Sequence, residues 1–143
     1  MQVGSMKDYI FCPKRFILHD TTINKIIVKT GVLVLCFENG AYLLDDHNKF
    51  YNKADPCEIE IYIDNLDIRK LYQHINVRMI RKGKIKEIEF DSFLTLLSKN
   101  KLNVDIDYYS YFARSLLIKG FVRKFEILLE ITEIKDIRLQ SLR

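Results

Sequence analysis

Alternation of apolar and polar side chains with a period of two recurs along this chain and constrains its fold more than any other feature. It is clearest at residues 57–64, where the apolar positions are Cys57, Ile59, Ile61 and Ile63. Because successive side chains of an extended strand point to opposite faces of a sheet, the pattern predicts a strand with one buried face. Further alternations follow at 75–80, 104–108 and 121–131, so the chain is predicted to consist mainly of strands.

Turn signals between these runs predict antiparallel hairpins. The segment 22–29 leads through a Thr-Gly step into the run at 32–37, which is apolar on both sides and predicts an interior strand covered on both faces. Asn39-Gly40 is typical of a two-residue type I′ turn and predicts a return strand at 41–44. Lys82-Gly83 and Lys119-Gly120 are interpreted as two further turns, the second after a strand at 111–118.

One segment has the spacing of a helix. Within residues 91–100, Phe93, Leu96 and Leu97 recur at i, i+3 and i+4; Asp91 is the expected cap and Asn100 the expected left-handed end. The predicted fold class is therefore mainly β. We expect an antiparallel, hairpin-rich sheet that curls, or a two-layer sandwich, with one short helix at about 91–100 that packs its apolar face onto the sheet.

Length and cysteine usage bound the organisation of the chain. Its 143 residues predict one domain over residues 1–143 with a single core and an irregular N-terminal segment at 1–15. Residues 1–5 are interpreted either as a cloning remnant or as the natural start. The three cysteines show no CxxC spacing and indicate reduced thiols in the cytoplasm, although a pair between Cys12 and Cys57 stays open. No apolar run approaches the roughly 20 residues that span a bilayer, so a membrane partner is not expected.

Sequence motifs that would identify an enzyme are absent. The chain contains no GxSxG, HExxH, paired CxxC or phosphate-binding glycine loop, so no catalytic residue, metal or cofactor is assigned. Imidazole and carboxylate groups adjoin at His19-Asp20 and at Asp45-Asp46-His47, and such groups can bind a divalent metal or move protons. A metal-dependent or hydrolytic enzyme is the third hypothesis; a strand-edge histidine and a solvated loop explain the same residues more simply.

Positive charge concentrates around the predicted turn at Lys82-Gly83, in a chain of net charge +4. A projecting basic hairpin can contact phosphates, and nearby aromatic rings can stack on unpaired bases. Lysines on an exposed hairpin also protect edge strands from aggregation. Nucleic-acid binding is therefore the alternative function, with Arg78, Arg81, Lys82, Lys84 and Lys86 as its site. The basic residues Arg69, Lys70, Arg114, Lys119, Arg123 and Lys124 and the aromatic residues Tyr108, Tyr109, Tyr111 and Phe112 are its candidate neighbours.

The leading hypothesis is a small, non-enzymatic, cytoplasmic module that binds another protein or a second copy of itself. Acidic residues gather at 45–60 and basic residues at 78–86. Such a polarised surface suits a partner whose approach is electrostatically steered.

Overall fold

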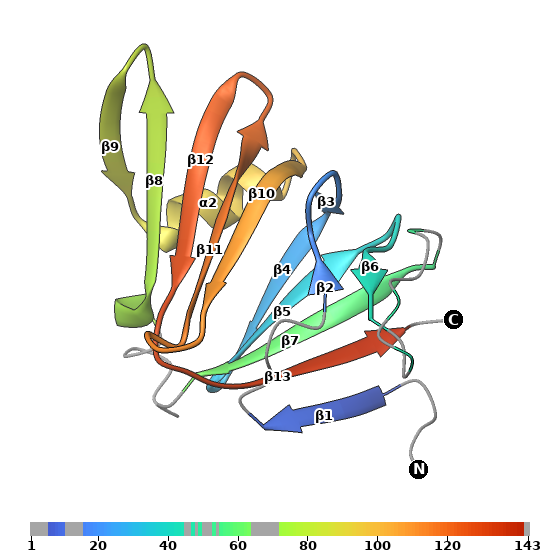
Figure 1. The fold of residues 1–143 in the computed structure, drawn as a ribbon. Helices are drawn as coiled ribbons and strands as arrows, with labels where there is room; N and C mark the ends of the chain where they lie inside the picture. The colour runs from blue at the N-terminus through green and yellow to red at the C-terminus, as the bar shows by residue number, and fades with distance from the viewer. Residues whose placement is uncertain are drawn as a thin grey trace.

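The computed structural model describes residues 6–10, 16–44, 47, 49, 53, 55–63 and 72–141. The chain is mainly β: two antiparallel sheets of five and six strands, a small two-stranded sheet, and one short α-helix in the described part of the chain. Both large sheets and the helix contribute to one hydrophobic core. The predicted fold class is thus confirmed, in the form of two layers that diverge toward one side (Figure 1).

The five-stranded sheet has the order β1-β13-β7-β5-β4. Its strands are β1 (Met6–Ile10), β4 (Lys25–Lys29), β5 (Val32–Phe37), β7 (Cys57–Ile63) and β13 (Ile134–Ser141). The alternation at 57–64 is confirmed, because every second residue of β7 from Cys57 to Ile63 is buried. β5 pairs with β4 and β7, which confirms its interior position in the sheet. Its Leu33, Leu35 and Phe37 are buried on the core side, whereas on the other face Val34 is buried and Val32 and Cys36 are only partly buried.

The six-stranded sheet has the order β3-β10-β11-β12-β8-β9. Its strands are β3 (Thr22–Ile23), β8 (Ile75–Arg81), β9 (Lys84–Ile88), β10 (Leu102–Ser110), β11 (Ser115–Val122) and β12 (Phe125–Ile131). β2 (Phe16–Ile17) and β6 (Tyr42–Leu43) form the small sheet, and a 3-10 turn, η1 (Tyr72–His74), precedes β8. The chain passes from one large sheet to the other between β3 and β4, between β7 and β8, and between β12 and β13 (Figure 1).

Two predictions about the first half of the chain are wrong. The segment 22–29 is not one strand: β3 pairs with β10 and β4 pairs with β5, so the strand divides where the chain changes sheets. Asn39-Gly40 does not close a hairpin either. Only Gly40 has a positive φ there, its N–H donates to the Phe37 carbonyl, and the following β6 pairs with β2. The turn therefore redirects the chain into the small sheet.

A β-bulge overturns the alternation predicted at 104–108. The register of β10 against β11 shifts between Val104 and Ile106, so one extra residue occupies β10. Beyond the bulge the faces exchange: Ile106 and Tyr108 are exposed, and Asp107 is buried. The Asp107 Oδ1 atom accepts a hydrogen bond from the Leu18 N–H at 3.1 Å, which ties the β2–β3 connection to the sheet.

The predicted turn at Lys119-Gly120 is wrong, because β11 continues through both residues to Val122. The segment 111–114 is a turn, not part of a strand, and Arg123 and Lys124 form the next turn, with Arg123 at a φ of 56°. Gly120 has a different purpose. A Cβ atom there would lie 2.3 Å from the Asn103 carbonyl oxygen, so the residue allows β10 to approach closely.

The helix is confirmed, with corrected ends. α2 (Phe90–Leu97) begins one residue earlier than predicted, with Glu89 and not Asp91 as its N-cap residue. Phe90, Phe93 and Leu97 are buried, so the predicted apolar face does pack into the core. Asn100 is not in the left-handed conformation; its side-chain amide donates instead to the Leu96 carbonyl at 3.0 Å. At the N-terminus, residues 6–10 form β1 against β13, so the segment 1–15 is not irregular throughout.

Candidate interaction surface

Two hairpin turns bring basic side chains together at one end of the six-stranded sheet. β8 and β9 are joined by Lys82-Gly83, where both residues have positive φ, as a type I′ turn requires. β11 and β12 are joined by Arg123-Lys124. Because β12 pairs with β8 with Glu126 opposite Ile80, both turns lie at the same end of the sheet (Figure 1). We call this region the basic end; it comprises Arg81, Lys82, Lys84, Lys86, Arg123 and Lys124.

An aromatic ring lies among these cations. The Arg81 guanidinium lies 5.6 Å from the centroid of the Phe125 ring, a cation–π contact between neighbouring strands. Arg81, Arg123, Lys124 and Phe125 line a cavity of about 280 Å³ between the two turns. Within the described ranges no carboxylate forms an ion pair with any residue of the basic end. The basic end can therefore bind an anionic group of a ligand without first breaking an ion pair with a carboxylate of this chain.

The other predicted basic residues lie elsewhere. Arg78 lies on the outer face of β8 and contacts Glu87 across the hairpin at 3.9 Å. Lys119 pairs with Glu126 at 3.1 Å, and Arg114 lies in the turn at the opposite end of β11. Of the five predicted site residues, the structure thus brings four together at the basic end and places Arg78 on the adjoining face. Arg69 and Lys70 lie outside the described residues.

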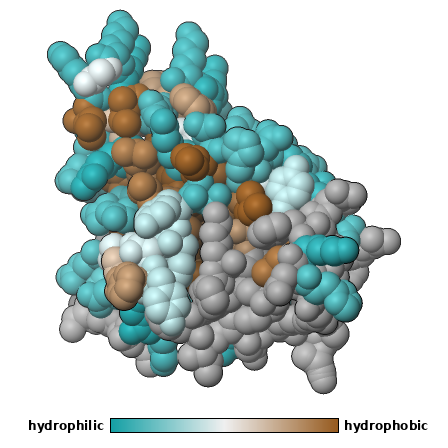
Figure 2. Space-filling model, viewed as in Figure 1, coloured by the Kyte–Doolittle hydropathy of each residue, from teal (hydrophilic) through white to brown (hydrophobic). Residues whose placement is uncertain are grey.

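The outer face of the six-stranded sheet carries apolar side chains in an exposed position. Figure 2 shows hydrophobic residues gathered over the upper part of this sheet, below hydrophilic residues at the hairpin ends. Because one face of an antiparallel sheet usually meets water with polar side chains, this pattern needs an explanation. We call this surface the apolar face. Its members are Ile80, Ile85, Ile106, Tyr108, Leu117, Phe121 and Leu128, of which Ile85 and Tyr108 are each 65% exposed.

The charges on the apolar face are largely neutralised. Lys119 and Glu126 lie between its apolar members and form an ion pair with each other, and the Arg78–Glu87 pair lies beside them. A partner that covers this face therefore has few uncompensated charges to desolvate. An apolar centre with paired charges and a charged rim has the composition of a protein–protein interface.

A fully exposed aromatic residue lies in the turn at the far end of β10 and β11. Phe112 is 99% exposed, and its only ring contact among described residues is an edge-on one with Tyr111 at 6.2 Å. An aromatic side chain so placed contributes little to folding. Such residues are typical anchors of protein interfaces.

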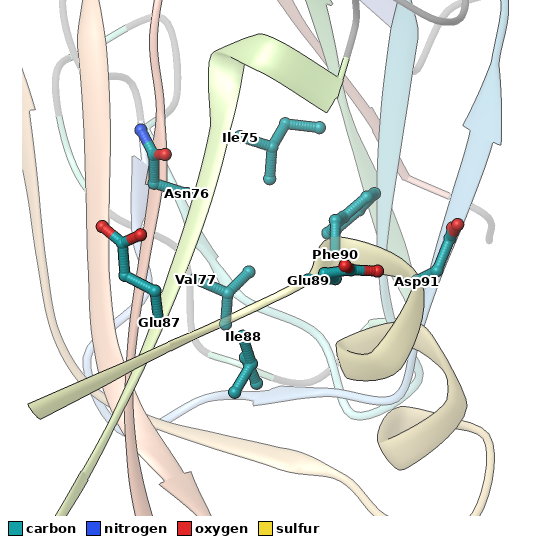
Figure 3. A pocket seen from close by; sticks show the side chains of 8 residues that line it. All are labelled: Ile75, Asn76, Val77, Glu87, Ile88, Glu89, Phe90 and Asp91. Atoms are coloured by element: carbon teal, nitrogen blue, oxygen red, sulfur yellow. The ribbon is translucent and has the colours of Figure 1, made fainter.

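A second cavity, also of about 280 Å³, lies where β9 leaves the sheet and α2 begins. Ile75 and Val77 lie on one side of β8 and extend toward α2, whereas Asn76 and Glu87 lie on the other side (Figure 3). Glu87, Glu89 and Asp91 also line this cavity. These carboxylates would repel a phosphate group, so the cavity is unsuited to nucleotides.

The imidazole and carboxylate groups predicted as a third possible site do not form a cluster in the described part of the chain. The His19 Nδ1 atom contacts the Asp105 carbonyl beside the bulge, and the Lys53 ammonium contacts the Asp20 carbonyl. Asp45 and Asp46 lie outside the described residues, and His47 is exposed. No group of three metal-ligating side chains occurs among the residues described, nor does a helix long and apolar enough to cross a membrane.

A polar network covers part of the outer face of the five-stranded sheet. Arg138 donates to the Tyr62 hydroxyl and to the Asp136 carboxylate, each at 3.3 Å, and its guanidinium stacks on the Tyr62 ring. The Tyr62 hydroxyl in turn donates to Glu60 at 3.1 Å. Burial, and then the charge of Glu60, raise the pKa of Tyr62.

The thiols of Cys36 and Cys57 in the five-stranded sheet are poor nucleophiles. Burial, and then the carboxylate of Glu58, raise the pKa of Cys36, and burial raises the pKa of Cys57 to about 11. Both therefore stay protonated near neutral pH, whereas a nucleophilic cysteine needs the thiolate. Neither forms a disulfide, so the open pair between Cys12 and Cys57 does not form; Cys12 itself lies outside the described residues.

Comparison of the chain with protein families, with curated proteins and with solved structures finds no match. Function must therefore be inferred from the surface itself. Sequence reasoning identified most of the basic end but missed the apolar face, because a bulge and a displaced turn decide which way its residues point. The sequence did contain a signal for it: residues 116–118 and 127–129 are consecutive apolar residues, so each segment places apolar side chains on both faces of its strand.

Proposed function

We propose that this protein is a non-enzymatic binding module that holds another protein on the outer face of its six-stranded sheet. The observation that carries the proposal is the exposure of Ile85, Ile106 and Tyr108 on the outer face of the sheet. Nothing in the core requires apolar side chains at these positions, so a binding partner explains them. Phe112, fully exposed at the end of the same sheet, supplies an anchor. The free thiols of Cys36 and Cys57 suit a reducing compartment, so we place this activity in the cytoplasm.

The composition of the apolar face favours a protein partner over nucleic acid. Most of its members are isoleucine or leucine, whereas surfaces that stack on bases use aromatic rings beside uncompensated cations. Its cations, Arg78 and Lys119, are engaged with carboxylates, and Glu130 lies on the same face. These features support burial against an apolar protein surface.

The basic end specifies the partner further. Because side chains alternate along a strand, Arg81, Lys84 and Lys86 point to the side of the sheet opposite the apolar face. Lys82, Arg123 and Lys124 lie in the turns at its end, so a partner seated on the apolar face meets the cations of these turns at the rim. Charge complementarity then calls for a partner whose apolar patch is bordered by aspartate or glutamate. Such a pair should associate faster at low salt, because rim charges act mainly on the rate of association.

The test compares three immobilised proteins in nuclease-treated lysate of the source cells. They are the wild type, an apolar-face variant (Ile106→Thr, Tyr108→Thr and Phe112→Ser), and a control variant changed at exposed polar positions (Asn39→Ser and Ser92→Ala). We expect one protein to bind the wild type and the control and to be lost from the apolar-face variant. That protein, purified, should bind directly, with an affinity at least about tenfold weaker for the apolar-face variant.

Two results would overturn this proposal. In the first, no protein distinguishes the wild type from the apolar-face variant. In the second, the purified partner binds both with equal affinity. Calorimetry at two temperatures adds an independent check, because burial of the apolar face requires a negative heat-capacity change on binding.

A second candidate function, nucleic-acid binding, is favoured by one specific observation. The cavity lined by Arg81, Arg123 and Lys124 also presents the Phe125 ring, so phosphate contact and base stacking could occur together. Fluorescence anisotropy with mixed-sequence single- and double-stranded oligonucleotides tests it at low and physiological salt. Binding that weakens steeply with salt and is lost in Arg81→Glu, Lys82→Glu would support this function. The matched control is Lys29→Glu, Lys135→Glu on the five-stranded sheet.

A further inference from the structure

We infer that the outer edge of β9 is a docking site for an extended, acidic segment of the partner, which adds to the six-stranded sheet as a further strand. The inference rests on the proposed function, because it assigns one part of the partner to one edge of the same surface. β9 is the last strand of its sheet, and no strand in the described part of the chain pairs with its outer edge.

The hairpin geometry leaves backbone groups available at this edge. Arg81 and Lys84 flank a two-residue turn, so they form the first pair that exchanges both backbone hydrogen bonds between β8 and β9. Such pairs alternate with pairs that do not exchange hydrogen bonds. The N–H and C=O groups of Ile85 and Glu87 therefore point away from β8, as a strand that adds to a sheet requires.

The side chains of β9 also favour addition of a strand. Lys84, Ile85, Lys86 and Glu87 are all exposed, so β9 projects beyond the core on both of its faces. An added strand could thus contact a row of two lysines on one face and Ile85 on the other. Edge strands are protected from such pairing by covering, by shortening or by charged side chains, above all lysine. In the described structure β9 is not covered, and its protection is the charge of Lys84 and Lys86, which an acidic strand would neutralise.

Charge along the edge changes sign. Lys82, Lys84 and Lys86 lie toward the turn, and Glu87, Glu89 and Asp91 lie toward α2. Because opposite charges directly across a strand pair stabilise it and like charges destabilise it, this gradient selects the occupant. The fitting segment carries two carboxylates two residues apart, facing Lys84 and Lys86, with an apolar residue between them to meet Ile85.

A second copy of this chain fits the edge poorly. If two β9 strands pair antiparallel about a two-fold axis centred on Ile85 or on Lys86, lysine lies directly opposite lysine. The same lysines thus oppose self-association and attract an acidic strand.

The test uses the full-length protein and a blocked peptide of about seven residues that alternates glutamate with valine. In ¹⁵N-correlated NMR spectra, we expect the peptide to shift the amide signals of residues 84–88 and to slow hydrogen exchange at Ile85 and Glu87. The same peptide with N-methyl groups on its alternate amides cannot complete the ladder and should bind at least about tenfold more weakly.

Variants of β9 distinguish the contribution of its backbone hydrogen bonds from that of its side chains. Ile85→Pro removes an N–H that points away from β8, so it should block the peptide by about tenfold or more and leave the hairpin paired. Ile85→Ala keeps that N–H and should bind the peptide within a few-fold of the wild type. The double variant Lys84→Glu, Lys86→Glu should reject the glutamate peptide and accept a lysine–valine one, whereas Lys29→Glu, Lys135→Glu should behave as wild type.

The outcomes distinguish this inference from the proposed function. Equal binding of the N-methylated peptide, or no discrimination by the Lys84 and Lys86 variant, overturns edge pairing even if Ile85→Pro fails to fold. If a partner then still depends on Phe112 and Ile106, the proposed function stands without the edge. If the peptide binds at β9 but no partner depends on the apolar face, the proposed function falls and the edge site stands.

Discussion

At the scale of single residues, Gly120 shows how one position lets two strands meet. Its lack of a Cβ atom allows the Asn103 carbonyl oxygen to lie 2.3 Å from where that atom would be, next to the bulge of β10. Gly120→Ala should therefore lower the free energy of unfolding by about 1–3 kcal/mol, as overpacking against backbone does. Denaturant unfolding followed by circular dichroism measures this change.

The control for this prediction is Gly83→Asn. Gly83 has a φ of +77°, but a Cβ atom there would meet nothing within 4 Å, and asparagine tolerates the left-handed conformation. The left-handed conformation strains any side chain, but asparagine least, so this variant should lose less than about 1 kcal/mol. If Gly120→Ala and Gly83→Asn lower the free energy of unfolding equally, the close approach of the Asn103 carbonyl does not explain the need for glycine at position 120.

The buried thiol of Cys57 predicts a loss of stability in alkali. Its pKa is about 11 in the folded protein, against an ordinary value near 9.0, because burial disfavours the thiolate. A raised folded pKa gives stability that is complete below pH 9 and lost as pH rises through 11. The shift corresponds to roughly 2–3 kcal/mol. Raised pKa values at Cys36 and Tyr62 act in the same direction.

Cys57→Ala isolates this contribution. The variant is less stable near neutral pH because it leaves space in the core, but its free energy of unfolding should fall less between about pH 9 and pH 11. Unfolding in urea at several pH values gives both curves. Parallel curves for the wild type and the variant would contradict the assignment to Cys57.

At the scale of elements, α2 begins without a side-chain cap. Glu89 has the extended backbone of an N-cap residue and its carbonyl accepts the Phe93 N–H, but its side chain makes no capping hydrogen bond. Aspartate reaches the free N–H groups of the first turn better than glutamate. Glu89→Asp should therefore raise stability by about 0.5–1 kcal/mol, measured as a higher melting temperature. Glu38→Asp, in an exposed turn, is the matched control and should change nothing measurable.

The elements also show where local prediction succeeds. β7 and the hairpin of β8 and β9 follow from alternation and from a Lys-Gly turn, because each depends on neighbouring residues. The break between β3 and β4 does not follow, since β3 pairs with β10, which is distant in sequence. The course of β11 past Gly120 does not follow either, because it depends on the register and bulge of the neighbouring β10 and not on the local Lys-Gly signal. Local patterns therefore identify strands better than they identify where strands change partner.

At the scale of the whole molecule, the chain crosses between its two large sheets at β3–β4, β7–β8 and β12–β13 and builds one core from both. We therefore predict that residues 1–143 unfold as a single cooperative domain. Far-UV circular dichroism, tyrosine fluorescence and protection of the Cys57 thiol should give one midpoint in a variant with Cys12 and Cys36 changed to serine. Separate midpoints would indicate that the two sheets fold independently.

By itself, the sequence determined the fold class, the interior position of β5, the helix that buries Phe93 and Leu97, and the positive charge near Lys82. Each depends on periodicity or composition within a short segment. Only the tertiary structure decided that Arg123 and Lys124 join this charge, that Ile106 and Tyr108 point outward, and that β9 is an open edge. These features depend on which strands pair and in which register, and a shift of one residue moves a side chain to the other face.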